Sequence, residues 1–131
     1  MLFKKKIDLI MVDTLIGANT FFTGNIELKG TIKIAGRLEG DINSEGDIIV
    51  AEGASIVGNL FGNNIIISGD VEGNVMAHEQ LRLTPSGNLN GNMHVTSLIT
   101  DEGATFHGKC EMLEKNFVSN FEEDYVQPED E

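Results

Sequence analysis

Apolar and polar residues alternate in short runs along the middle of the chain, and these runs recur at a regular spacing. Four clear runs are Ile32-Lys33-Ile34, Ile48-Ile49-Val50, Ile65-Ile66-Ile67 and Leu81-Arg82-Leu83. Alternation with a period of two among β-branched residues predicts short strands with one buried face. With Ile16 and Ile99 taken as the middle residues of weaker outer copies, the middle positions step by 17, 16, 17, 16 and 17 residues.

A second pattern repeats with the same period. The motif apolar, any residue, Gly, polar, apolar occurs six times, with its glycines at Gly24, Gly40, Gly58, Gly73, Gly91 and Gly108. Because strands this short bury their inner faces only by coiling, the two patterns together predict an all-β solenoid, a parallel β-helix of about six coils over residues 14–112. Its coils are expected ~4.8 Å apart, and helices are nearly excluded between residues 14 and 110.

The alternation also assigns side chains to the inside and the outside of the coil. One inward wall is expected to consist of Leu15, Ile32, Ile48, Ile65, Leu81 and Leu98, and another of Ile26, Ile42, Leu60, Val75, Met93 and Cys110. Ile16 is expected to face outward, in line with Lys33, Ile49, Ile66, Arg82 and Ile99. Each motif glycine is expected at a corner too close to the axis for a side chain, followed by Asn or Asp as turn residues.

Composition limits the classes of function. The 131 residues fit one domain, and the formal charge of −12 makes a nucleic-acid partner improbable. Cys110 is the only cysteine, which excludes an internal disulfide and a cysteine-based zinc site and fits a reducing cytosol. The apolar stretch in residues 1–13 is too short for a signal peptide or a transmembrane helix. We therefore expect a cytoplasmic protein with an N-terminal tail (1–13) and an acidic C-terminal tail (113–131).

Sequence motifs give little support to an enzyme. There is no phosphate-binding loop, nucleophile elbow or His-Glu-x-x-His pair, so no catalytic residue, cofactor or metal ligand is predicted. The rival enzyme class is the left-handed β-helix acyltransferase, whose hexapeptide repeat fits fragments of the chain. Its rhythm breaks between Ile56 and Ile65, and His78, His94 and His107 occupy unlike positions in their coils.

Three stretches carry a resemblance to a known family. Residues 14–17 (Thr-Leu-Ile-Gly), 30–42 with the run Gly36-Arg37-Leu38-Glu39-Gly40-Asp41-Ile42, and 103–110 are similar to the bactofilins. The resemblance implies a right-handed β-helix that assembles without nucleotide into filaments lacking overall polarity. It further implies a scaffold at the inner face of the cell membrane that positions client proteins in cell shape, motility or envelope processes. A second bactofilin is a candidate partner besides the chain itself.

The two ends of such a coil are the predicted polymerisation interface, because each presents unpaired backbone groups like a sheet edge. The residues concerned are Leu15, Phe21 and Phe22 at the first coil and Leu98, Phe106, Cys110 and Met112 at the last. Phe21 has outward parity. The alternative is that these residues only plug the ends of a non-polymerising β-helical binding module. The tail allows two interpretations: Leu113, Phe117 and Phe121 as a helical cap, or a solvated acidic end.

Two further surfaces are predicted. The first combines apolar and basic side chains near the N-terminus and suggests contact with an anionic membrane: Leu2, Phe3, Lys4, Lys5 and Lys6. The alternatives for this segment are a disordered start, or a strand from Ile7, Leu9 and Met11 added to the first coil. The second is an outward apolar patch that would serve lateral bundling of filaments or contact with a partner protein. It consists of Ile49, Phe61, Ile66 and Ile99, with Ile16 and Val57.

Overall fold

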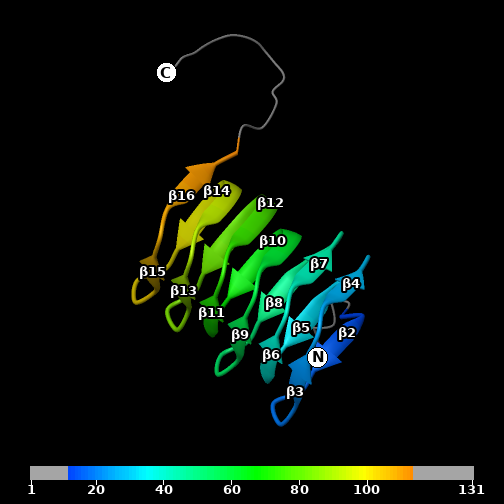
Figure 1. The fold of residues 1–131 in the computed structure, drawn as a ribbon. Coiled ribbons are helices and arrows are strands. Elements are labelled where there is room, and N and C mark those ends of the chain that lie inside the picture. Colours follow the sequence, from blue (N-terminus) through cyan, green and yellow to red (C-terminus); the bar gives the residue numbers. More distant parts are fainter. Residues whose placement is uncertain (1–11, 114–131) are drawn as a thin grey trace, which may run out of the picture.

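The computed structural model describes residues 12–113, and its regular structure consists entirely of short parallel strands (Figure 1). The strands are β2 (Thr14–Ile16), β3 (Phe21–Thr23), β4 (Ile26–Leu28), β5 (Ile32–Ile34), β6 (Arg37–Glu39), β7 (Ile42–Ser44), β8 (Ile48–Val50), β9 (Ser55–Val57), β10 (Leu60–Ile67), β11 (Asp70–Glu72), β12 (Val75–Leu83), β13 (Asn88–Asn90), β14 (Met93–Thr100), β15 (Thr105–His107) and β16 (Cys110–Met112). The predicted fold class, an all-β parallel coil of about six turns, is confirmed.

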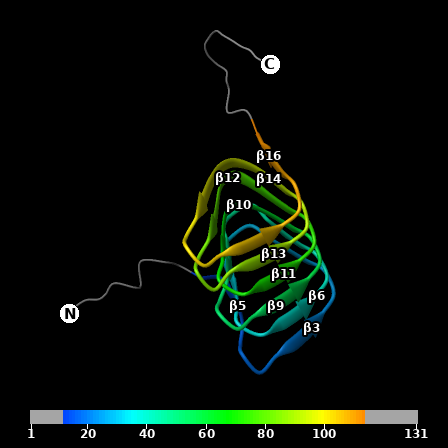
Figure 2. The same ribbon diagram turned by 90° about the vertical axis from the view of Figure 1, so that its left-hand side faces the viewer.

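Successive coils stack around a common axis and form three walls (Figure 2). Wall 1 contains β2, β5, β8 and the second halves of β10, β12 and β14. Wall 2 contains β4, β7, the first halves of those three long strands, and β16. Wall 3 is a separate six-stranded sheet in the order β15-β13-β11-β9-β6-β3.

The core is a set of apolar columns that run along the inside of the three walls. On wall 2 the column runs Ile26, Ile42, Leu60, Val75, Met93 and Cys110, as predicted. On wall 3 it runs Phe22, Leu38, Ile56, Val71, Leu89 and Phe106. The inner members are 0–1% exposed. Each such side chain contributes ~1.5–3 kcal/mol on burial, so repetition of these buried positions from coil to coil holds the stack together.

The first coil departs from the prediction on wall 1. Leu15 pairs with Lys33 and is 63% exposed, whereas Ile16 pairs with Ile34 and is buried. The assignments of Leu15 as inward and Ile16 as outward are therefore wrong. The first coil has a four-residue connection (17–20) and a three-residue connection (29–31), so it is one residue longer than the assumed step of 17. A slip of one residue in a strand exchanges its two faces.

Glycine is required at the motif positions because the neighbouring coil leaves no room for a side chain there. All six have φ between 138° and 152°. A Cβ atom on Gly40, Gly58, Gly73, Gly91 or Gly108 would overlap the carbonyl oxygen of the motif glycine one coil earlier. The corner therefore repeats a close backbone contact between coils, and the expected proximity to the axis is not the reason for glycine there.

The residues that follow these glycines form a hydrogen-bonded ladder along the corner. The N–H groups of Asp41, Asn59, Asn74, Asn92 and Lys109 each donate to the side-chain Oδ1 one coil earlier, at 2.9–3.1 Å. The acceptors, in the same order, belong to Asn25, Asp41, Asn59, Asn74 and Asn92. The Asn and Asp residues thus serve contacts between coils as well as the turn itself. We call this series the corner ladder.

Candidate assembly surfaces

The first coil presents an apolar edge at the N-terminal end of the stack, here called the N-terminal rim (β2, β3 and β4). Leu15 and Phe21 are 63% and 61% exposed, and Val12 is also exposed. Phe21 points outward, as its parity predicted, and the guanidinium carbon of Arg37 lies 5.4 Å from its ring centroid. Phe22 points inward and packs against the core. This rim therefore carries apolar side chains both across the end of the core and around its margin.

The last coil presents the corresponding C-terminal rim (β15, β16 and residues 98–100 of β14). Phe106 and Leu98 are partly buried and pack against the core. Met112 is 54% exposed and Cys110 is exposed, whereas Met93, one coil below Cys110 in the same column, is fully buried. The difference in exposure within one column arises because no further coil of the described residues covers the last one.

Backbone groups at the corner give the two rims opposite hydrogen-bonding character. In the inner coils, N–H groups of the motif glycine and of the residue two positions later donate to carbonyls of the next coil, as Gly91 does to His107 and Met93 does to Lys109. By the same pattern, Gly108 and Cys110 direct N–H groups outward at the C-terminal rim. Carbonyl groups of Thr23 and Asn25 point outward at the N-terminal rim. Within residues 12–113 these groups have no partner, as at an open sheet edge.

The outward apolar series lies on wall 1 and begins with Leu15 instead of Ile16. It continues through Lys33, Ile49, Ile66, Arg82 and Ile99. Ile99 is exposed, and Ile49 and Ile66 are half-buried. The predicted residue Phe61 is exposed on the adjacent wall 2, and Val57 on wall 3. The structure thus places three of the four predicted lateral residues in one line and the fourth on the neighbouring wall.

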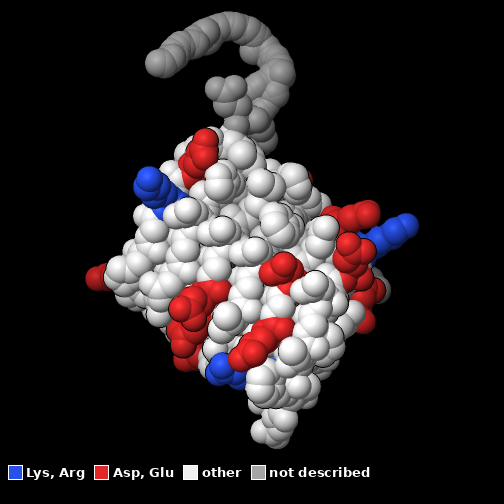
Figure 3. All heavy atoms as spheres, viewed as in Figure 1, with Lys and Arg blue, Asp and Glu red and all other residues white. Residues whose placement is uncertain are grey.

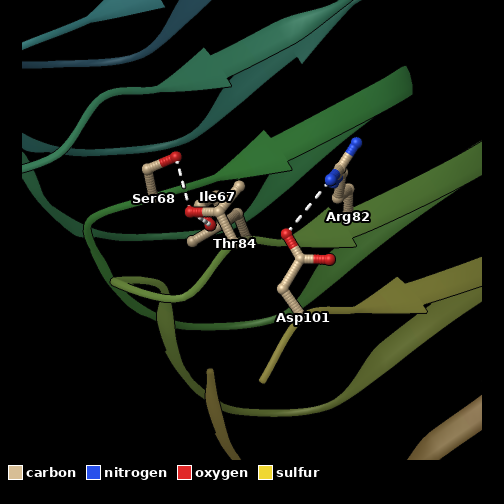
Figure 4. A network of polar contacts seen from close by, with 5 residues as sticks. All are labelled: Ile67, Ser68, Arg82, Thr84 and Asp101. Carbon is tan, nitrogen blue, oxygen red and sulfur yellow. Dashed lines mark hydrogen bonds and ion pairs between the residues drawn. The ribbon is translucent and has the colours of Figure 1, made fainter. Parts of the chain in front are cut away.

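The wall 1 series contains two cations, Lys33 and Arg82, and Arg82 is paired with an acidic side chain. Arg82 forms an ion pair with Asp101 of the next coil at 3.1 Å, close to the contact of Thr84 Oγ1 with Ser68 Oγ at 2.8 Å (Figure 4). The face drawn in Figure 3 carries broad areas of uncharged surface, and more acidic than basic side chains are seen on it. Pairing between coils therefore neutralises one of the two cations in the wall 1 series.

The three histidines, all within the described residues, lie apart from one another. His78 lies in β12, His94 lies in β14 beside Glu111 at 3.0 Å, and His107 lies on wall 3. An open groove on the first coils is lined by Glu27, Leu28, Lys29, Asn43 and Glu45, without histidine or cysteine. Among residues 12–113 no cluster of three metal-ligating side chains occurs, and no helix could span a membrane.

Some predicted residues lie outside the described range. These are the membrane-contact residues Leu2, Phe3, Lys4, Lys5 and Lys6, the alternative strand residues Ile7, Leu9 and Met11, and the tail residues Phe117 and Phe121. Within the range, the contribution of the corner residues to stacking was not predicted from the sequence. The signal was present, since Asn or Asp follows five of the six motif glycines.

The comparisons with known proteins agree with this geometry. Residues 14–111 match the family model Bactofilin, described as polymer-forming cytoskeletal. Bactofilin BacP of Myxococcus xanthus is 29% identical over 100 residues, covering 76% of this chain and 42% of BacP. Bactofilin BacO of the same organism is 24% identical over 103 residues, covering 79% of this chain and 82% of BacO. The chain thus spans less than half the length of BacP.

A solved structure shares the fold. It is a cryo-EM reconstruction of double helical filaments of Thermus thermophilus bactofilin, with a TM-score of 0.71 and 26% sequence identity. The match covers 74% of this chain and 96% of that one. The aligned region is therefore nearly the whole of the filament-forming chain in that reconstruction.

Proposed function

The chain belongs to the bactofilin family of polymer-forming cytoskeletal proteins, and we propose that it is a scaffold subunit that assembles end to end through its two rims. Assembly proceeds without nucleotide, because the sequence contains no phosphate-binding loop. A subunit with two adhesive ends forms an open fibre instead of a closed ring.

The observation that carries this proposal is the exposure of core positions at the ends of the stack. In the wall 2 column, Met93 is fully buried and Cys110 is exposed. Phe22 and Phe106 end the wall 3 column and are only partly buried, whereas Leu38 and Leu89 inside that column are fully buried. Joining two rims would bury these side chains at ~25 cal/mol per Å² of apolar surface, before association costs.

The wall 1 series is the proposed lateral contact. The similar bactofilin of Thermus thermophilus was reconstructed as double helical filaments, and two strands in one filament require a contact along their sides. Ile49, Ile66 and Ile99 would supply the apolar part of that contact in this chain, with Phe61 at its edge. A client protein or a second bactofilin bound to the same side is the alternative occupant.

Membrane attachment completes the proposal. Leu2, Phe3 and the three lysines at residues 4–6 would hold the filament at the inner face of the cell membrane, with clients positioned along it. Attraction of each lysine to anionic lipid is worth ~1 kcal/mol, so one copy binds weakly. Many copies along a filament would bind together through avidity.

Negative-stain electron microscopy and sedimentation of the purified full-length chain without nucleotide test the function. Filaments that pellet at high speed are the expected result. A monodisperse monomer at high concentration, with an intact β-sheet spectrum, would instead favour a non-polymerising binding module.

A further inference from the structure

The corner ladder does not continue beyond the last coil. Five consecutive acceptors are Asn or Asp side chains, but the sixth corner residue is Lys109. The backbone N–H of Lys109 is paired with Oδ1 of Asn92 at 3.1 Å, so the ladder reaches this residue. Its side chain has donors only and no acceptor. Lys109 therefore donates its backbone N–H to the coil below but offers no side-chain acceptor to a coil stacked above.

Apart from this side chain, the corner is complementary for head-to-tail stacking, in which the N-terminal rim of one copy lies on the C-terminal rim of another. Gly108 and Cys110 direct N–H groups outward at one rim, and Thr23 and Asn25 direct carbonyls outward at the other, following the pattern of the inner coils. The motif glycines at the two rims, Gly24 and Gly108, share the backbone conformation of the inner ones. The backbone at this corner could thus continue from copy to copy as an unbroken coil.

The mismatch arises at the N–H group of Asn25. In every later coil, the equivalent N–H donates to the Oδ1 atom of the preceding corner residue. In a head-to-tail joint the preceding corner residue would be Lys109 of the other copy. The joint would place a buried N–H group opposite an ammonium-bearing side chain and leave that N–H without an acceptor, which is unfavourable.

We propose that Lys109 ends the corner ladder and thereby selects against head-to-tail joints between copies of this chain. This inference rests on the proposed end-to-end assembly. The role of Lys109 concerns the sense of assembly and not the strength of the fold, because its side chain is exposed and pairs with no other described residue. Joints between rims of the same kind do not set Lys109 over Asn25 and escape the mismatch. Lys109 thereby makes head-to-tail joints less favourable than joints between rims of the same kind.

Disulfide crosslinking reads out the sense of the joint directly. Thr23 and His107 occupy the first and last positions of one outward column on wall 3. With Cys110→Ser removing the only native cysteine, Thr23→Cys and His107→Cys lie at opposite ends of one copy. Only a head-to-tail joint brings these two cysteines of different copies to ~4.8 Å, within the range for a disulfide. Mass spectrometry after mild oxidation distinguishes 23–107 links from 23–23 and 107–107 links.

Two substitutions at position 109 in this background complete the test. Lys109→Asn supplies the missing acceptor and is expected to raise the yield of 23–107 links by ~10-fold or more, the effect of satisfying one buried N–H group. Lys109→Met removes the charge without adding the acceptor and is expected to leave that yield low. Abundant 23–107 links with Lys109 present, or equal yields from the Asn and Met variants, would overturn the proposal.

Electron microscopy of the same samples separates this proposal from the proposed function. If the protein with Lys109 forms no filaments, end-to-end assembly as the native function fails. The comparison of Lys109→Asn with Lys109→Met still decides whether the ladder controls head-to-tail contact, because it scores joints of that kind at any filament length.

Discussion

The backbone N–H of Asn59 donates to the carboxylate Oδ1 of Asp41 at 2.9 Å, across two successive coils. Asp41 is the one carboxylate in a ladder whose other acceptors are asparagines. Because both side chains place an oxygen at the same position, the ladder depends on the acceptor and not on the charge. This distinction makes Asp41 a suitable residue at which to measure what the ladder contributes.

Asp41→Ala is expected to lower the free energy of unfolding by ~1–2 kcal/mol, because it leaves the half-buried N–H of Asn59 without its acceptor. Asp41→Asn keeps the oxygen and is expected to change stability by less than ~0.5 kcal/mol. Urea unfolding of the two variants followed by circular dichroism gives the comparison. An equal loss in both would show that the negative charge matters instead.

The corner glycines allow a second comparison. Gly58 has φ of 152°, and an added Cβ would overlap the carbonyl oxygen of Gly40, whereas Gly53 has φ of 90° and nothing within 4 Å of an added Cβ. Gly53→Ala is expected to cost ~1–2 kcal/mol for its backbone conformation alone. Gly58→Ala adds the overlap and should cost ~1–3 kcal/mol more. Thermal unfolding of both variants checks the order, and equal losses would contradict the close contact between coils.

The residues on walls 2 and 3 could be predicted from the sequence, because two residues always separate the wall 3 strand from the wall 2 strand at the glycine corner. The buried face of the wall 1 strands was harder to predict. Its connections vary in length, and the adjacent Leu15 and Ile16 allow either parity. Only the pairing of Ile16 with Ile34 determines which of them is buried.

The assembly surfaces were predictable in part. The end coils and the outward parity of Phe21 follow from the repeat. The corner ladder does not follow, because Asn and Asp after glycine serve an isolated turn equally well. Their bonds between coils depend on the stacking register, which single-chain patterns do not specify. For the same reason Lys109 had no predicted role before the positions were aligned in space.

The first prediction on assembly concerns Phe106, which ends the wall 3 column at the C-terminal rim. Phe106→Arg is expected to abolish filaments while the β-sheet spectrum remains, because a joint would have to bury the guanidinium group. Asn90→Arg is the matched control, since Asn90 is exposed on wall 3 one coil below. Filaments in both variants, seen by electron microscopy, would exclude the C-terminal rim as an interface.

Lateral association should respond to a different change. Ile66→Lys places a lysine in the wall 1 series, a position at which other coils already carry Lys33 and Arg82, so folding should be retained. Filaments are expected to persist but to become single strands, narrower in electron micrographs. Asn43→Lys, on wall 2, is the control for added charge. Double strands that survive Ile66→Lys would move the lateral contact to another wall.

Membrane attachment is predicted from residues 2–6 and depends on the filament for its strength. Deletion of these residues should reduce co-sedimentation with vesicles containing phosphatidylserine by ~10-fold or more, since three lysines and two apolar side chains are lost. Filaments should form as before, because neither rim as described includes these residues. Replacing Lys4, Lys5 and Lys6 by glutamine should give an intermediate loss of vesicle binding relative to the unchanged chain. This difference should disappear in high salt, where electrostatic attraction is screened.

Phe106→Arg in the otherwise unchanged chain should also weaken vesicle binding if avidity along the filament supplies the affinity. Vesicle binding unaffected by the deletion would contradict the assignment of the membrane contact to this segment, and unaffected binding of the Phe106→Arg variant would show that single copies bind strongly by themselves.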